Sequence, residues 1–412
     1  MAVTMYLRLW VMVFLQYYIW STWYVTMGNY LTESLKFPGG QVGLAYGTTA
    51  IGAMASSFFV GIVADRFFAT ERILSILHIV GAGLLYFVST LQTFAEFYPV
   101  LMIYTITFMA AHALTNSLTL HHCKNAAVEF PVVMVMGSVG WMIAGIVVGF
   151  CKLENSPGMF QLAALAALVM GIYSLTLPHT PPKGKDAPMS PRVLLGLDAL
   201  RLMRDRSFAT FIICSFLICV PLSFYFSWIN VFMNESNIPY AAAKLTIGQG
   251  SDVLFLLMLP IMLLFFGAKG ILLLGMAAWA FRFFLFRTFA VDLTAQWMLY
   301  LGIAVHGMCY DFIFVMGRMY VDKRATVDIR GAAQGFHVFV TLGLGMFVGS
   351  WLAGVVGQYY SYTEIVGGKE ATLHHWQNIW LVPAVMSIIL FVAFALLFKD
   401  NSPPVLEVAD TA

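Results

Sequence analysis

Charged residues are scarce in this chain of 412 residues. Asp, Glu, Lys and Arg make up 10% of it, whereas a soluble domain is about a quarter charged. Hydrophobic residues make up 60%, and apolar stretches long enough to cross a bilayer as a helix recur from end to end. The alternating apolar and polar pattern of a membrane barrel is missing. The composition therefore excludes an ordinary soluble protein and predicts an all-α polytopic membrane protein.

Several catalytic and metal-binding signatures are missing as well. The chain lacks a Walker A sequence, a G-x-S-x-G elbow and an H-E-x-x-H motif, so we expect no enzyme activity. Its five cysteines lack metal-ligand spacing and predict neither a metal site nor a disulfide framework. The adjacent His pairs at 121–122 and 374–375 are expected at membrane interfaces. We expect no cofactor other than a coupling proton, and no nucleic acid as a partner.

The apolar stretches indicate about twelve spans. We assign them near 5–28, 41–63, 72–91, 96–118, 131–151, 159–178, 207–233, 245–266, 270–290, 294–317, 332–356 and 379–398. Lys and Arg then gather in the loops of one side, which predicts that both termini are cytoplasmic. The first stretch is expected to be an uncleaved span rather than a signal peptide.

One polar segment divides the chain. Residues 179–206 are rich in Pro and charge and too polar to span a membrane. They separate an N-terminal half, 1–178, from a C-terminal half, 207–400, which a cytoplasmic tail, 401–412, follows. Two six-helix halves joined by a cytoplasmic linker are the pattern of the major facilitator fold, in which the substrate site lies between the halves near the bilayer midplane. By analogy with that fold we expect a monomer.

A charged turn between the second and third spans carries Gly61, Asp65, Arg66 and Arg72. It resembles the G-x-x-x-D-R-x-x-x-R/K signature of major facilitators. Such a turn can pair with a neighbouring helix end and act as a conformational latch. The alternative is a loop that follows the positive-inside rule and holds an incidental Asp.

Two carboxylates interrupt predicted spans. Asp252 lies in the eighth and Asp311 in the tenth. A carboxylate at mid-bilayer costs roughly 2.5–3.5 kcal/mol on insertion scales and must be hidden from lipid. Such residues commonly bind protons, ions or substrate, so both are candidates for proton coupling. The alternative is a buried hydrogen bond that holds helices together.

Aromatic, amide and hydroxyl side chains share the spans with these acids. This mixture is typical of a site for a small, polar, partly planar ligand such as a sugar or a nucleoside. The alternative for a single aromatic residue is lipid contact or an interface belt. The candidate ligand-binding residues are Ser138, Trp141, Ser223, Tyr225, Phe226, Gln249, Asp252, His306 and Tyr310.

At these residues the chain resembles the nucleoside:H+ symporter family of bacterial major facilitators over nearly its whole length. The resemblance rests on Gln16, Trp20 and Trp23, on the segments 113–117, 137–141 and 221–225, on Gly248, Gln249 and Asp252, and on 310–312. It implies a proton-coupled nucleoside importer of the bacterial inner membrane. It also implies a pocket formed by Ser138, Trp141, Gln249, Asp252 and Tyr310, with Asp311 as the coupling residue.

The chain departs from this family near the expected pocket. Met134 stands where the family usually has Arg, and Asp252 where it usually has Glu. Ser223 and Phe226 replace a polar pair, and Ala111 and His112 replace a common Pro-Thr pair. We expect Met134 to make Asp311 easier to protonate or to change which ligand is accepted. The alternative function is therefore transport of another small polar solute, such as a sugar, a nucleobase or a modified nucleoside.

Overall fold

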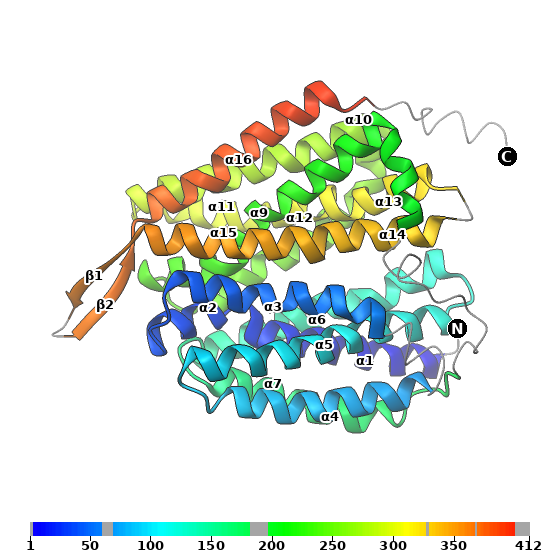
Figure 1. Cartoon of the computed structure of the whole chain (residues 1–412), viewed down its shortest axis with the longest axis horizontal. Coiled ribbons are helices and arrows are strands. Elements are labelled where there is room, and N and C mark those ends of the chain that lie inside the picture. The colour runs from blue at the N-terminus through cyan, green and yellow to red at the C-terminus, as the bar shows by residue number, and fades with distance from the viewer. Residues whose placement is uncertain (1–2, 60–68, 182–196, 327–328, 367–368, 400–412) are drawn as a thin grey trace.

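The computed structural model describes residues 3–59, 69–181, 197–326, 329–366 and 369–399. Its helices run roughly parallel in two bundles, one above the other in Figure 1. Both termini lie at one end of the molecule, and a β-hairpin projects from the opposite end (Figure 1). The latch residues Gly61, Asp65 and Arg66 and the expected tail at 401–412 lie outside the described residues.

The N-terminal half is built from long helices with one irregular connection. They are α1 (Val3–Tyr24), α2 (Met27–Asn29), the π-helical turn η1 (Tyr30–Ser34), α3 (Gly39–Phe59), α4 (Thr70–Val88), α5 (Phe94–His122), α6 (Ala126–Phe150) and α7 (Gly158–Ser174). The 3-10 helix η3 (Leu197–Arg204) follows within the predicted linker.

The C-terminal half has more broken helices. They are α9 (Arg206–Glu235), α10 (Ala241–Val291), α11 (Gln296–Ala304), α12 (His306–Tyr310), the π-helical η4 (Asp311–Val315), α13 (Met316–Arg324), α14 (Arg330–Val338), the π-helical η5 (Phe339–Gly345), α15 (Met346–Tyr359) and α16 (Trp376–Leu397).

Seven of the described helices are long and apolar enough to span a membrane, and the bent pair Gln296–Ala304 and His306–Arg324 would make eight. Each predicted span overlaps helical residues, although α10 covers both the eighth and the ninth. Gly267 separates those two with φ +63°, a conformation that favours glycine. The all-α membrane architecture is confirmed, whereas the count of twelve spans stays a prediction.

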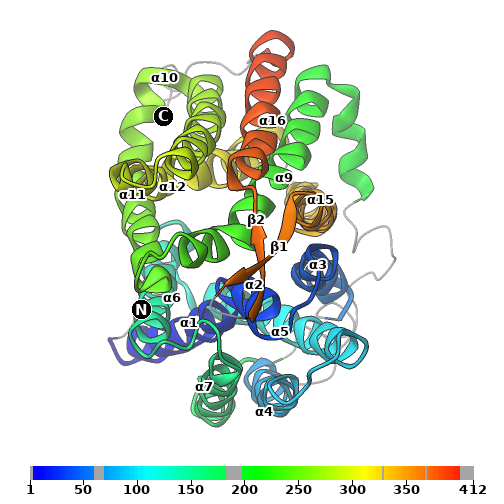
Figure 2. The same ribbon diagram turned by 90° about the vertical axis from the view of Figure 1, so that its left-hand side faces the viewer.

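A short antiparallel hairpin was not expected from the sequence. Strand β1 (Ser361–Val366) pairs with β2 (Lys369–His374) between α15 and α16. The carboxylate of Glu235, at the end of α9, accepts hydrogen bonds from His374 Nδ1 and Trp376 Nε1, each at 2.7 Å. These bonds fix the base of the hairpin to the C-terminal half. Figure 2 shows it in front of the helix ends.

The buried apolar side chains form two clusters. One runs from Leu9 to Leu177 in the N-terminal half, and the other comes almost entirely from 199–398. Small residues bring the halves together: a Cβ on Gly43 of α3 would lie 2.3 Å from the Ser350 carbonyl oxygen of α15. The α6–α10 contact is also close, because a Cβ on Gly149 would lie 2.7 Å from the Ala243 amide nitrogen. Only glycine allows these approaches.

Candidate substrate pocket

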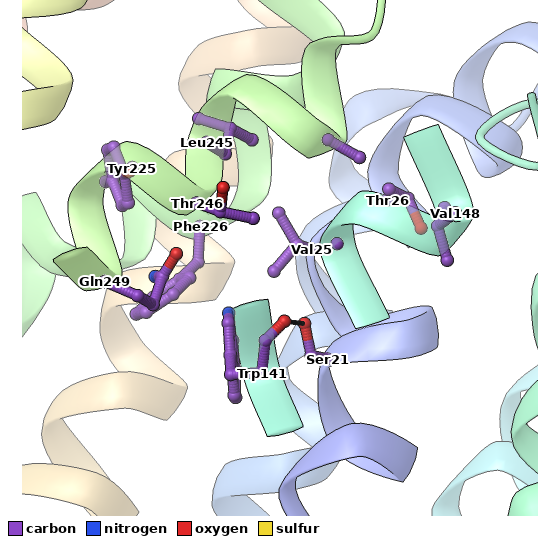
Figure 3. A pocket seen from close by; sticks show the side chains of 12 residues that line it. Ser21, Val25, Thr26, Trp141, Val148, Tyr225, Phe226, Leu245, Thr246 and Gln249 are labelled. Carbon is purple, nitrogen blue, oxygen red and sulfur yellow. Dashed lines mark hydrogen bonds between the residues drawn. The ribbon is translucent and has the colours of Figure 1, made fainter. Parts of the chain in front are cut away.

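A pocket lies between the two halves, where α1 and α6 face α9 and α10 (Figure 3). A site between the two halves is what the major facilitator fold predicts. The residues that line it are Ser21, Val25, Thr26, Trp141, Gly145, Val148, Tyr225, Phe226, Ala242, Leu245, Thr246 and Gln249. Four of the candidate ligand-binding residues are among them: Trp141, Tyr225, Phe226 and Gln249.

Aromatic rings and one amide give the pocket its chemistry. In Figure 3 the Trp141 ring stands opposite Phe226 and Gln249, which come from the other half. Ser21 donates a hydrogen bond to the Trp141 carbonyl oxygen at 3.0 Å and so ties α1 to α6 behind that ring. Flat apolar faces with an amide between them suit a planar, polar ligand.

A His–Asp pair lies directly behind the pocket. The rings of Tyr225 and His306 have centroids 5.1 Å apart, and His306 Nε2 is 4.0 Å from Asp252 Oδ2. The ring of Tyr310 also stacks on His306, with ring centroids 6.0 Å apart. None of the described residues offers a hydrogen-bond partner to Asp252 Oδ1 or His306 Nδ1. These candidates therefore form one cluster, adjacent to the pocket rather than in its wall.

Tight packing of α12 on α10 produces this arrangement. The Gly307 amide donates a hydrogen bond to Ser251 Oγ at 2.9 Å, and a Cβ on Gly307 would lie 2.5 Å from the Ser251 carbonyl oxygen. Because residue 307 has no side chain, its neighbour His306 can approach Asp252. The Gly307 position thus determines the distance within the pair.

Asp311 begins the π-helical segment η4, a deviation often found at functional sites. Its side chain is 4% exposed, and within the described part of the chain Oδ2 has no hydrogen-bond partner. A buried carboxylate that lacks a partner is costly as a charge. Asp311 is thus placed as a group that can take up a proton, which remains a prediction.

A buried cation that the sequence analysis did not single out lies close by. Arg282 of α10 is fully buried; its Nε donates to the Gly302 carbonyl oxygen at 2.8 Å and Nη2 to that of Ile303 at 3.4 Å. These are carbonyls at the end of α11, where the helix breaks before His306. The guanidinium also lies 4.2 Å from the Tyr225 ring centroid. A charge inside an apolar stretch, the criterion that found the two Asp residues, would have found Arg282 too.

Other predicted residues do not face the pocket. The Ser223 hydroxyl donates to the Cys219 carbonyl oxygen at 2.8 Å and packs against Gly349 of α15. Ser138 is partly buried on α6, one turn before Trp141, and is not a lining residue.

The latch candidate Arg72 is exposed in the first turn of α4. Beside it, buried Glu71 accepts hydrogen bonds from the Thr180 amide at 3.0 Å and from His179 Nδ1 at 2.8 Å.

A second carboxylate site joins the halves near the hairpin end. Glu154, in the turn between α6 and α7, is 7% exposed. Its Oε2 accepts hydrogen bonds from Asn230 Nδ2 at 2.7 Å and Asn234 Nδ2 at 2.9 Å, and its Oε1 accepts one from the Ala242 amide at 3.0 Å. All three donors belong to the C-terminal half. Glu154 lies in a loop, so no helical periodicity in the sequence indicates this contact.

Comparison with known proteins identifies the family. Residues 1–403 match the family described as nucleoside H+ symporter. The chain belongs to this family. It is 37% identical over 411 residues to YegT of Escherichia coli K12, which covers 97% of this chain and 95% of YegT. It is 32% identical over 412 residues to the xanthosine permease of the same organism, which covers 97% of each chain.

A solved structure supports the same assignment. The crystal structure of the nucleoside transporter NupG matches with a TM-score of 0.85 at 29% identity, covering 96% of this chain and 100% of that one. The D-xylose-proton symporter, at 14% identity and a TM-score of 0.71, shows the fold alone. This member of the nucleoside H+ symporter family is a multi-pass membrane transporter and not an enzyme. The predicted family and the major facilitator fold are confirmed.

Proposed function

We propose that this symporter-family chain imports nucleosides together with protons by alternating access. The observation that carries the proposal is the pocket between the halves, with ring faces and Gln249 in its wall and Asp252, His306 and Asp311 beside it. The relatives named as xanthosine permease and nucleoside permease support the substrate class. We place the protein in the bacterial cytoplasmic membrane with both termini cytoplasmic. Because one chain builds the whole pocket, we propose that it acts as a monomer.

The buried carboxylates supply the coupling. Asp311 takes a proton from the outer side before the nucleoside binds, and its neutral form lets the cavity close around it. After the halves rock, the proton leaves to the more alkaline cytoplasm. One proton moved through about 100 mV yields roughly 2.3 kcal/mol, and one pH unit adds about 1.4 kcal/mol. Together they allow accumulation of several hundredfold, at about 1.4 kcal/mol per decade.

The contacts between the halves support alternating access. Glu154 bonds to α9 and α10, and the Gly40 amide of α3 donates to Gln358 Oε1 of α15 at 3.0 Å. Both contacts lie toward the hairpin end, which is the outer end in the proposed orientation. The structure thus fits a state that is closed to the outside.

Uptake into proteoliposomes tests the proposal. Labelled uridine and adenosine should accumulate under an inside-alkaline pH gradient, and a protonophore should abolish the accumulation. No uptake of either nucleoside, together with accumulation of a labelled sugar or nucleobase under the same gradient, would support the alternative solute. Accumulation that survives the protonophore would exclude proton coupling.

A further inference from the structure

A cluster of unpartnered polar atoms lies in the N-terminal half, outside the residues that line the pocket. His112 and Asn116 are one turn apart on α5 and share a face. Asn116 Nδ2 and His112 Nε2 are 3.5 Å apart. The described part of the chain provides no hydrogen-bond partner for His112 Nδ1 or Asn116 Oδ1, although both atoms are buried. Buried polar atoms are normally paired, so two neighbouring exceptions mark a candidate binding site.

Aromatic rings of α1 surround this pair. The His112 ring is 5.4 Å from the Tyr17 ring and 5.3 Å from the Trp20 ring, each meeting it edge-on. Trp20 in turn lies 5.7 Å from Trp141, which lines the pocket. Trp20 Nε1 is a third buried polar atom of this cluster, a donor for which the residues of the described ranges hold no acceptor. The cluster therefore extends the pocket into the N-terminal half, and only the ring of Trp20 separates His112 from the pocket residue Trp141.

The pair presents one donor and one acceptor in either arrangement of its hydrogen atoms. If Asn116 Nδ2 donates to His112 Nε2, the neutral ring carries its proton on Nδ1, and Nδ1–H and Oδ1 remain free. If the amide is turned round, Nε2–H donates to the amide oxygen, and an acceptor on Nδ1 and an amide N–H remain free. A neighbouring donor and acceptor complement the hydrogen-bonding edge of a nucleobase.

We propose that His112 and Asn116 bind the polar edge of the nucleobase, within a cage completed by Tyr17 and Trp20. This inference rests on the nucleoside transport proposed above and places the base toward the N-terminal half. The ribose then lies toward Gln249 and the C-terminal half. A sugar has no planar donor–acceptor edge, so the pair also selects nucleosides against sugars.

Competition by methylated bases tests the assignment. Uridine and 3-methyluridine differ by a methyl group that removes the N3–H donor from the base edge. In the wild-type protein, 3-methyluridine should inhibit labelled uridine uptake at least about tenfold less well than uridine does, because the site loses a paired buried group. In His112→Leu and Asn116→Leu the ratio should fall toward one, through a raised KM for uridine with Vmax retained.

Two further variants make the result specific. His112→Gln keeps one donor and one acceptor and should retain the discrimination. His121→Leu is the matched control, because His121 is exposed on the same helix, and its ratio should equal that of the wild type. Each variant is compared after it elutes as a single species in detergent.

The outcomes separate this inference from the proposed function. No uptake of any nucleoside by the folded wild-type protein would overturn the proposed function, and the inference with it. Normal uridine uptake with an unchanged ratio in His112→Leu and Asn116→Leu would overturn the inference alone. If the KM for uridine and the inhibition constant of 3-methyluridine rise by the same factor, the pair does not contact N3–H of the base, and the inference is also overturned.

Discussion

Glu154 and Asn230 belong to opposite halves of the molecule, and Asn230 Nδ2 donates a hydrogen bond to Glu154 Oε2 at 2.7 Å. The same carboxylate accepts the Ala242 amide, one of the free N–H groups at the start of α10. It thus also caps that helix, where a negative charge is favourable. All these bonds must break for the halves to separate at the hairpin end.

Replacing Glu154 should favour the state that is open at this end. Glu154→Gln leaves one acceptor for three donors, and hydrogen bonds to charged groups are worth about 1.5–3 kcal/mol each. We expect the open population to rise about tenfold or more. Spin-label distances between residues 161 and 293, exposed in opposite halves, measure it. Glu364→Gln on the hairpin is the control, and an unchanged distance distribution in Glu154→Gln would count against the contact as a lock.

Arg282 should be needed for the geometry of the pocket. Arg282→Met leaves the Gly302 and Ile303 carbonyls unpaired at the α11 break and removes the cation from beneath Tyr225. We expect kcat/KM for uptake to fall at least about tenfold and the melting temperature to drop. Arg282→Lys should retain only part of the wild-type kcat/KM and melting temperature, since an ammonium lacks the planar fork of a guanidinium.

The matched control for Arg282 is Arg287→Met, a partly buried Arg on the same helix. Its uptake should stay within about twofold of wild type. Equal losses in Arg282→Met and Arg287→Met would show a general cost of removing a cation from α10, not a role for the α11 break.

Asp311→Asn should separate transport from coupling. The amide has nearly the shape of the carboxyl group but cannot exchange a proton, so pH-driven accumulation should disappear while exchange of labelled for unlabelled nucleoside continues. Parallel assays of net uptake and exchange in proteoliposomes measure the two. Full retention of protonophore-sensitive accumulation would remove Asp311 from the coupling role.

Asp205 should stabilise the start of the C-terminal half. It lies outside the spans and caps α9. The Phe208 amide donates to Oδ1 at 3.0 Å and holds the pKa of Asp205 below its usual value. The nearby Arg324 lowers that pKa further. Because the folded-state pKa is the lower one, this stabilisation is present above about pH 4 and is lost as the pH falls through the folded-state value.

Asp205→Asn keeps the cap, because Asn serves as well as Asp at this position, and removes only the charge. It should therefore lower the free energy of unfolding at pH 7 by about 0.3–1 kcal/mol, as is typical of a charge near a helix N-terminus. Melting temperatures in detergent should show a difference that shrinks below about pH 4. Asp322→Asn, in a half-exposed pair with Arg330, should have a smaller effect. A difference independent of pH would argue against the charge of Asp205 as the cause.

Composition and span length by themselves determined the class of this protein, because long stretches with so little charge are stable only in the hydrocarbon of a bilayer. They also identified Asp252 and Asp311, since a carboxylate inside an apolar stretch stands out at any position. They did not determine which side of a helix faces a neighbour. Lipid is as apolar as a protein interior, so the sequence of a membrane helix marks its buried face only weakly.

Tertiary structure therefore decided the details of the site. Ser223 and Tyr225 are two residues apart, yet the first bonds within the helix against α15 and the second reaches the pocket. Glu154 finds its partners in the other half. Arg282 donates to the carbonyls at the break between α11 and α12. That break is a feature of the tertiary packing of α12 on α10. Each of these contacts joins segments distant in the chain, and local sequence patterns carry no information about such distances.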